Sequence, residues 1–192
     1  MRVYVQEFRK NCEIVGFKNV EINETEAFLE MANRDKPAGV EVQFFDADVV
    51  ATWQHLYFAV LNALTAFKNR ENISRSVAME TMLYASARRQ IQKATQLLGI
   101  KPTSSNIAVL VVGGKLEAVQ SALARISKRI GGQPDDSVLE LSKKKKKKKM
   151  EKIKRVFEIS EAELETVVER DDVEKALVDL VVEQVALLAT AR

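Results

Sequence analysis

Residues 46–68 constrain the fold more than any other segment, because their apolar side chains recur at helical spacing. The apolar stripe consists of Val49, Trp53, Leu56, Tyr57, Val60, Leu64 and Phe67, and a second side carries Ala59, Ala63 and Ala66. Alanines are small enough to let another helix approach closely. The segment therefore predicts one long helix that packs through its stripe and is approached by a second helix on its alanine side.

Four segments are rich in the residues typical of strands, namely residues 2–8, 12–20, 40–45 and 106–112. Lys10 and Asn11 separate the first two, which predicts a hairpin turn at that point. The fourth segment, NIAVLVV, is apolar almost throughout, as expected for a strand that is covered on both faces. Residues 137–141 (SVLEL) are compatible with a further strand at the sheet edge.

Helical patterns fill most of the remaining chain. Asn23 and Glu26 have the spacing of a capping box that opens a helix over residues 24–34. Ser74 is a suitable N-cap for a long helical stretch to Leu98, which Gly99 ends. Further helices are predicted at 115–130, 143–157, from Ser160 with a capping box to Glu163, and at 172–190.

These elements predict an α+β fold with a small mixed, mostly antiparallel sheet of about four strands flanked by helices. Hydrophobic residues make up 46% of the chain and charged residues 30%, which is typical of a globular protein. We expect a single domain over residues 1–192, with an α/β core at 1–141 and C-terminal helices at 142–192.

Seven consecutive lysines, Lys143–Lys149, dominate the charge. Residues 143–155 carry a net charge of +9, whereas the other residues sum to −6. Like-charge pairs within the run cost roughly 1.5–3.5 kcal/mol in a helix, which contacts made by Ile153, Val156 and Phe157 can offset. The run is either a solvated helix face or a surface that attracts polyanions, and its composition alone indicates no particular site.

Catalytic constellations are not evident. Gly113, Gly114 and Lys115 follow a strand, but they lack the glycine spacing and the hydroxyl residue of a phosphate loop. His55 has no second histidine or cysteine at ligand spacing, so a hydrogen-bonded structural histidine is the first interpretation and a binding-surface role the second. An enzyme acting on nucleotides would need His55, Cys12 and an acidic group to converge. We expect neither a cofactor nor a metal.

No segment has the roughly 20 mostly apolar residues that a spanning helix needs, since Asp179 and Glu183 interrupt the most apolar one. The single cysteine, Cys12, fits a reducing compartment. A cytoplasmic protein without a membrane partner is therefore expected.

Basic and polar residues gather between positions 68 and 93, where a helix start offers N–H groups that suit phosphate. The members of this basic and polar cluster are Lys68, Arg70, Asn72, Ser74, Arg75, Ser76, Arg88 and Arg89, with Gln90 and Lys93 beside them. The alternative is that Ser74 only caps a helix and that the arginines are solvated.

The block 46–100 resembles the archaeal-type KEOPS complex subunits of the PRPK-binding protein (TPRKB) family. The resemblance rests on HLYFAVLNALTAF (55–67), ENISRSVAMETMLYAS (71–86) and RQIQKATQLLGI (89–100), with IAVLVVGG (107–114) and VEQVALL (182–188) in support. The family's segment before the last helices mixes Glu with Lys, whereas here it is a run of Lys.

This resemblance implies a non-enzymatic subunit that binds the small atypical kinase/ATPase of KEOPS. It also implies help in recruiting tRNA through the single-stranded 3′ CCA end for threonylcarbamoyladenosine synthesis, which a separate transferase subunit performs. The basic cluster would then grip the terminal nucleotides, and His55 or Tyr84 would stack a base.

The predicted kinase-binding face lies on the last helix, where apolar residues surround nearly the whole circumference. Its residues are Leu177, Leu180, Val181, Val185 and Leu188. The alternative is a helix that is fully internal. A kinase-binding interaction protein with little direct RNA role is the second functional hypothesis.

Overall fold

The computed structural model describes residues 1–141, 146–169 and 172–190, and these form an α+β fold with one sheet. The predicted cap Ser142 and the lysines 143–145 lie outside the described residues. The strands run in the order β1-β2-β4-β3, and β5 pairs with β2. All of these pairings are antiparallel, so the described sheet is not mixed. The strands are β1 (Arg2–Val5), β2 (Lys10–Lys18), β3 (Val40–Asp46), β4 (Ile107–Gly113) and β5 (Gln133–Pro134).

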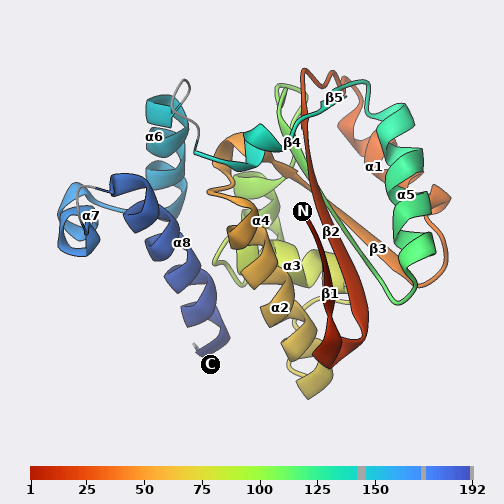
Figure 1. Ribbon diagram of the computed structural model, residues 1–192, viewed down its shortest axis with the longest axis horizontal. Coiled ribbons are helices and arrows are strands. Elements are labelled where there is room, and N and C mark those ends of the chain that lie inside the picture. The colour runs from red at the N-terminus through yellow and green to blue at the C-terminus, as the bar shows by residue number, and fades with distance from the viewer. Residues whose placement is uncertain (142–145, 170–171, 191–192) are drawn as a thin grey trace.

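Helices cover both faces of the sheet (Figure 1). One face is covered by α1 (Thr25–Asp35) and α5 (Leu116–Arg129), and the other by α2 (Trp53–Asn69) with the helices packed around it. The remaining helices are α3 (Val77–Ala85), α4 (Ile91–Leu98), α6 (Lys146–Phe157), α7 (Glu161–Val167) and α8 (Val173–Thr190), with short 3-10 turns η1 (Gln6–Phe8), η2 (Ala47–Val49) and η3 (Asp136–Leu139).

Strand β4 lies at the centre of this arrangement and is buried along its whole length, as its sequence predicts. Successive side chains of a strand point to opposite faces. Ile107, Val109 and Val111 accordingly pack in the core beneath α1 and α5, whereas Ala108, Leu110 and Val112 pack in the core shared with α2.

The second core continues from the sheet into the C-terminal helices. Ile153 and Phe157 of α6 and Leu177 and Val181 of α8 are buried in the same cluster as Leu110 of β4. Helix α2 packs against both α3 and α8, and its three alanines are buried. The C-terminal helices are therefore held by apolar contacts with the α/β core.

Two predicted helix boundaries are wrong. The helix predicted from Asp46 begins only at Trp53, because β3 continues to Asp46 and that carboxylate accepts a 3.0 Å bond from Asp48 N inside η2. The predicted helix 74–98 is split into α3 and α4. Ala87 adopts a left-handed conformation with φ of 51° at the break, where Arg88 N donates to Leu83 O.

The predicted caps and turns were partly correct. The capping box of Ser160 and Glu163 is confirmed, but α1 starts after Glu24 without a side-chain cap, so the box predicted for Asn23 and Glu26 is wrong. The first hairpin turns through η1 and Arg9, and β2 already starts at Lys10.

The stretch predicted as an edge strand at 137–141 is also different. It forms η3 instead, since Asp136 Oδ1 accepts a 2.8 Å bond from Gly16 N and anchors a turn there.

Candidate functional site

The loop at residues 70–76, which joins α2 to α3, is organised around a buried carboxylate. Glu80 is 1% exposed and accepts hydrogen bonds from Ile73 N at 3.0 Å and Ser74 N at 2.7 Å. Ser74 is buried as well, and its hydroxyl donates to Ser76 O at 2.8 Å. Asn72 Nδ2 donates to Ser74 O at 2.8 Å. Ser74 thus holds the loop together, and the prediction that it caps the helix is wrong, because Ser76 is the N-cap of α3.

The start of α3 is occupied by side chains of the protein itself. Ser76 is the true N-cap, because its hydroxyl accepts a 3.1 Å bond from Met79 N. Glu41 of β3 reaches across and accepts a 2.7 Å bond from Ala78 N. A carboxylate therefore already lies where we expected a phosphate, and this helix end is not the anion site that the sequence predicted.

The predicted basic residues separate into two groups. Lys68 lies 2.7 Å from Glu7 and over the ring of Phe8, and Arg88 lies 3.0 Å from Glu158, so both are engaged in ion pairs. The other exposed residues of the cluster are Arg70, Arg75, Arg89, Gln90 and Lys93, while Asn72 and Ser76 are half-buried.

A hollow lies between this loop, α3 and the C-terminal end of α8. We call it the loop hollow, and its lining residues are Glu71, Ile73, Glu80, Leu83, Tyr84, Arg89, Leu188 and Ala189. Proteins that bind single-stranded nucleic acids use such groups: aromatic and apolar side chains stack against the bases, and arginine neutralises the phosphate charge. Arg89 and Tyr84, which the sequence predicted as RNA contacts, do meet at this hollow.

Ile73 is the functional candidate that the sequence reasoning missed. Its side chain is 46% exposed although it is strongly apolar, and it lies between the half-buried Asn72 and the buried Ser74. The only signal in the sequence was an apolar residue inside a polar loop, which is also compatible with an anchor to the core.

His55 has a structural role, as its first interpretation predicted. It is fully buried, its Nδ1 accepts from Ala51 N at 3.3 Å, and its Nε2 donates to Ala85 O at 2.7 Å. Its ring packs edge-on against Phe157 with centroids 5.4 Å apart. Burial is the main cause that lowers its pKa to about 4, so the ring is neutral at pH 7. A base cannot stack on His55, and that prediction is wrong.

Helix α8 has an inner and an outer side. Leu177, Val181 and Val185 are fully buried in the core of the chain, so they cannot form the outer surface predicted for kinase binding. Leu180 is half-buried, and Leu188 is half-buried at the loop hollow. The helix is thus neither fully internal nor exposed on the side that we predicted.

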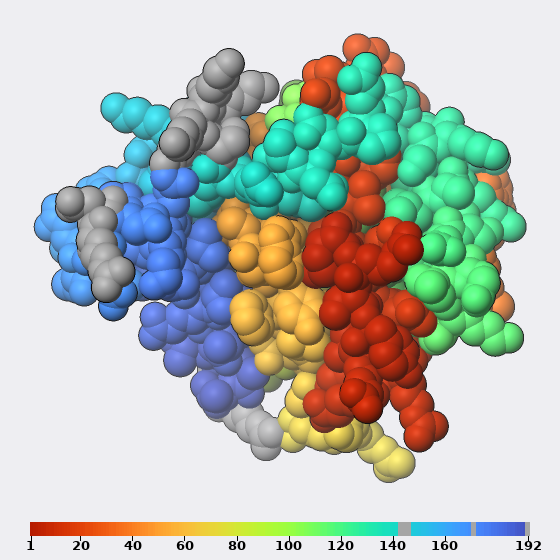
Figure 2. All heavy atoms as spheres, viewed as in Figure 1, coloured from red at the N-terminus to blue at the C-terminus, as the bar shows by residue number. Residues whose placement is uncertain are grey.

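Apolar side chains do reach the surface around the outer side of α8. Leu187 is 55% exposed, and Phe58 of α2, the helix packed against α8, is 42% exposed. Figure 2 shows the C-terminal helix, α2 and the N-terminal segment on one face of the molecule, with α2 in the middle. Exposed apolar groups on neighbouring elements are typical of a protein interface.

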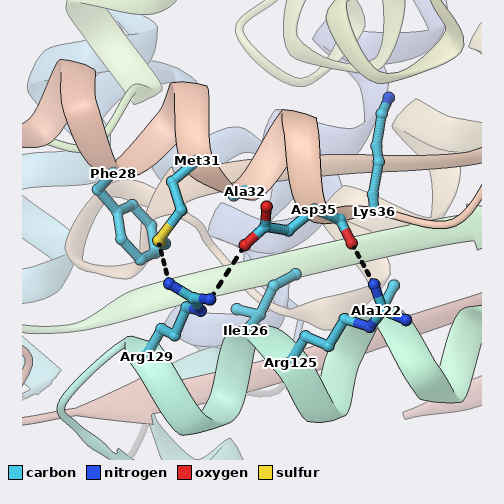
Figure 3. A pocket seen from close by; sticks show the side chains of 9 residues that line it. All are labelled: Phe28, Met31, Ala32, Asp35, Lys36, Ala122, Arg125, Ile126 and Arg129. Carbon is cyan, nitrogen blue, oxygen red and sulfur yellow. Dashed lines mark hydrogen bonds and ion pairs between the residues drawn. The ribbon is translucent and has the colours of Figure 1, made fainter.

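A groove on the opposite side of the sheet lies between α1 and α5 (Figure 3). Asp35 spans it, because its carbonyl accepts a 2.7 Å bond from Arg125 and its carboxylate lies 3.2 Å from Arg129. Arg129 also donates to Met31 Sδ at 3.0 Å. Asp35, Arg125 and Arg129 thus bind one another across the groove, and Lys36 points away from the two arginines, so the groove is not a candidate site.

Within residues 1–141, 146–169 and 172–190, no group of three or more His, Cys, Asp or Glu side chains has the arrangement of a metal site. None of the described helices is long and apolar enough to span a membrane.

A family model described as kinase binding protein CGI-121 matches residues 17–189. The chain belongs to the CGI-121 family. Among curated proteins, the regulatory protein Cgi121 of Methanocaldococcus jannaschii is 35% identical over 107 residues, which is 56% of this chain and 66% of that relative. The matched part is thus slightly less than two thirds of the relative's length. These matches confirm the resemblance predicted from residues 46–100.

Proposed function

We propose that this CGI-121 family member is a non-catalytic regulatory subunit of KEOPS. It binds the complex's small atypical kinase/ATPase and helps recruit tRNA through the 3′ CCA end for threonylcarbamoyladenosine modification, and it contacts the transferase subunit only indirectly. The family description, kinase binding protein, and the relative's name, regulatory protein, support the first part. The loop hollow supports the second.

The kinase-binding face is assigned to the outer side of α8 and the adjacent part of α2. Leu180 and Leu187 supply apolar area there, next to the acidic side chains of Asp179 and Glu183. Phe58 extends the apolar area onto α2. Large apolar side chains surrounded by polar ones form the usual core and rim of a protein interface.

The loop hollow is the observation that carries the RNA proposal. Ile73 and the ring of Tyr84 offer surfaces against which an unpaired base can pack, and Arg89 lies in the same hollow. Arg70 and Arg75 are exposed on the adjoining loop and are available to phosphates. Base stacking of this kind contributes about 1–3 kcal/mol per base and tolerates different sequences.

The second candidate function is a kinase-binding protein with little direct RNA role. It is favoured by the acidic residues Glu71 and Glu80 in the lining of the loop hollow. Glu80, however, already accepts two backbone N–H bonds, which disperse its charge into the loop.

Electrophoretic mobility shifts separate the two candidates. We expect intact tRNA to bind at least tenfold more tightly than the same tRNA lacking its three terminal nucleotides, because each stacked base lost is worth about tenfold. Equal binding of both probes would contradict recognition of the 3′ end and would leave kinase binding as the remaining candidate function.

A pair of variants then tests whether the two faces are separate. Leu187→Glu should abolish co-precipitation with the kinase and retain tRNA binding, since Leu187 is exposed and its change leaves the core intact. Arg75→Glu should weaken tRNA binding and retain co-precipitation with the kinase. A loss of both activities in either variant would contradict the separation of the faces.

A further inference from the structure

Helix α6 carries two kinds of basic residue, and the inner kind fixes the orientation of the helix. Lys149 Nζ donates to Val138 O at 2.7 Å, and Lys152 Nζ lies 2.6 Å from Asp48 Oδ2. Asp48 is held in turn by Asn106 at 2.8 Å. Together with the buried Ile153, these contacts bind one side of α6 to the core and define which lysines face outward.

Among the α6 side chains that the structure describes (147–157), the exposed cations on the outer side are Lys147, Lys148 and Arg155. The two carboxylates near them bind other residues, since Glu151 lies 2.6 Å from Lys154 and Glu158 lies 3.0 Å from Arg88. Within the described residues, no ion pair joins any of the three cations to a carboxylate. This side of α6 therefore keeps a net positive charge.

The basic side of α6 ends beside the loop hollow. Arg88, which binds Glu158 just after α6, is the neighbour of Arg89 in the lining of the hollow. Lys147 lies eight residues before Arg155, or about 12 Å along the helix axis at a rise of 1.5 Å per residue. The cations thus extend the positive surface away from the hollow.

We infer that the outer side of α6 is a second RNA contact, which binds backbone phosphates of the same tRNA whose 3′ end occupies the loop hollow. The inference rests on the proposed function. It concerns phosphates and not bases, because lysines and arginines on an open helix face neutralise the backbone without reading sequence.

The composition of this side of α6 favours a phosphate backbone over other anionic partners. Its exposed residues Lys147, Lys148, Glu151, Arg155 and Glu158 are all charged. A helix that binds a lipid surface inserts apolar side chains, and the core of a protein interface is poor in charged ones. The apolar residues Met150 and Val156 pack instead against the core.

The test is the salt dependence of tRNA binding by the full-length chain. The variant Lys147→Gln, Lys148→Gln, Arg155→Gln removes the three outer cations and leaves Lys149 and Lys152 in place. Each phosphate contact contributes about 0.7–0.9 to the slope of log K against log salt, so the slope should fall by about two to three. Affinity at low salt should fall roughly tenfold, both for intact tRNA and for tRNA trimmed of its three terminal nucleotides.

A matched control removes the same charge from the opposite side of the sheet through Lys36→Gln, Lys115→Gln and Lys128→Gln. Its slope should change by less than one. An equal loss in this control, an unchanged slope in the α6 variant, or a loss of kinase binding in place of RNA binding would each overturn the inference.

The same measurements keep the two proposals distinguishable. If the parent chain binds intact and trimmed tRNA equally, the 3′-end function fails whatever the α6 variant does. If the parent prefers intact tRNA and the α6 variant keeps its salt slope, the 3′-end function stands and the second contact is refuted.

Discussion

The loop at residues 70–76 and helix α6 are the two basic regions beside the loop hollow, and they use their polar side chains differently. In the loop the internal bonds are made by Ser74, Asn72 and the carboxylate of Glu80, so the arginines are left exposed. In α6 lysines both make the internal contacts and supply the exposed charge: Lys149 and Lys152 bind the core, while Lys147 and Lys148 face outward. Composition alone therefore indicates a basic region without indicating which of its cations are available.

Removal of the Glu80 carboxylate should produce the largest change in stability. Glu80→Ala leaves Ile73 N and Ser74 N without their acceptor, and Ser74 is buried. A hydrogen bond to a charged group contributes about 1.5–3 kcal/mol, so we expect the free energy of unfolding to fall by about 3 kcal/mol. Urea denaturation measures this loss.

The control for Glu80 lies on the same loop. Arg75→Ala changes an exposed side chain and should alter the unfolding free energy by less than about 0.5 kcal/mol. Equal destabilisation by both changes would show that the arginines also hold the loop together, and the contrast with α6 would disappear.

Acidification should produce the next largest effect, through His55 between the two regions. Its folded-state pKa of about 4 lies below its ordinary 6.5, so the unfolded chain takes up a proton that the folded chain resists. Stability is then complete above pH 6.5 and declines as the pH falls from 6.5 to about 4, by at most about 3 kcal/mol.

The window above pH 4.5 isolates this histidine from the stabilising carboxylates. At Asp48 desolvation raises the pKa, but the hydrogen bonds and charges of nearby lysines and Asn106 outweigh it, so the pKa is lowered; at Glu163 hydrogen bonds from Ser160 lower the pKa. The stabilisation by both carboxylates is lost as the pH falls below their ordinary values of 3.8 and 4.5. His55→Gln should therefore flatten the stability profile between pH 6.5 and 4.5. A slope that persists in this variant would assign the effect to other groups.

The fold was largely predictable because its strongest signals are apolar patterns. The stripe of α2 and the continuous apolar run of β4 correspond to a buried helix face and a strand covered on both sides. The boundaries failed where a polar contact overrides the pattern. Asp136 binding Gly16 N turned a strand-like stretch into η3, and Ala87 in a left-handed conformation divided the predicted helix.

The candidate site was predictable only in outline. Arg75 and Arg89 are exposed where the sequence placed a basic cluster, and Tyr84 lies beside Arg89. The contact of Glu41 with the start of α3 joins residues far apart in the chain, so no local pattern announced it. The inner side of α8 was likewise not predictable, because Val181 and Leu187 have the same apolar character and differ only in what lies next to them.

Loss of an inner lysine should have a moderate effect. Lys152→Met removes the ion pair with Asp48, which is 2.6 Å long and partly exposed, and should lower the unfolding free energy by about 1 kcal/mol. Lys148→Met removes an exposed cation for which the described residues offer no ion pair, and it should be neutral within about 0.5 kcal/mol. Thermal denaturation of the two variants side by side shows whether the division of α6 into inner and outer lysines is real. Equal melting temperatures would contradict it.

A further effect should separate two consecutive lysines by pH alone. Burial lowers the pKa of Lys149 from its ordinary 10.5 to about 8, although the nearby carboxylates of Asp48, Asp46 and Glu140 raise it. The unfolded chain therefore keeps this proton between pH 8 and 10.5 after the folded chain has released it, and stability should rise with pH across that window. Lys149→Met should remove the rise, and Lys148→Met should retain it, because Lys148 is exposed. Denaturation midpoints at pH 8 and pH 10 measure the difference. A rise that survives in the Lys149 variant would mean that this lysine is as solvated as its neighbour, and α6 would then be an undivided cationic helix.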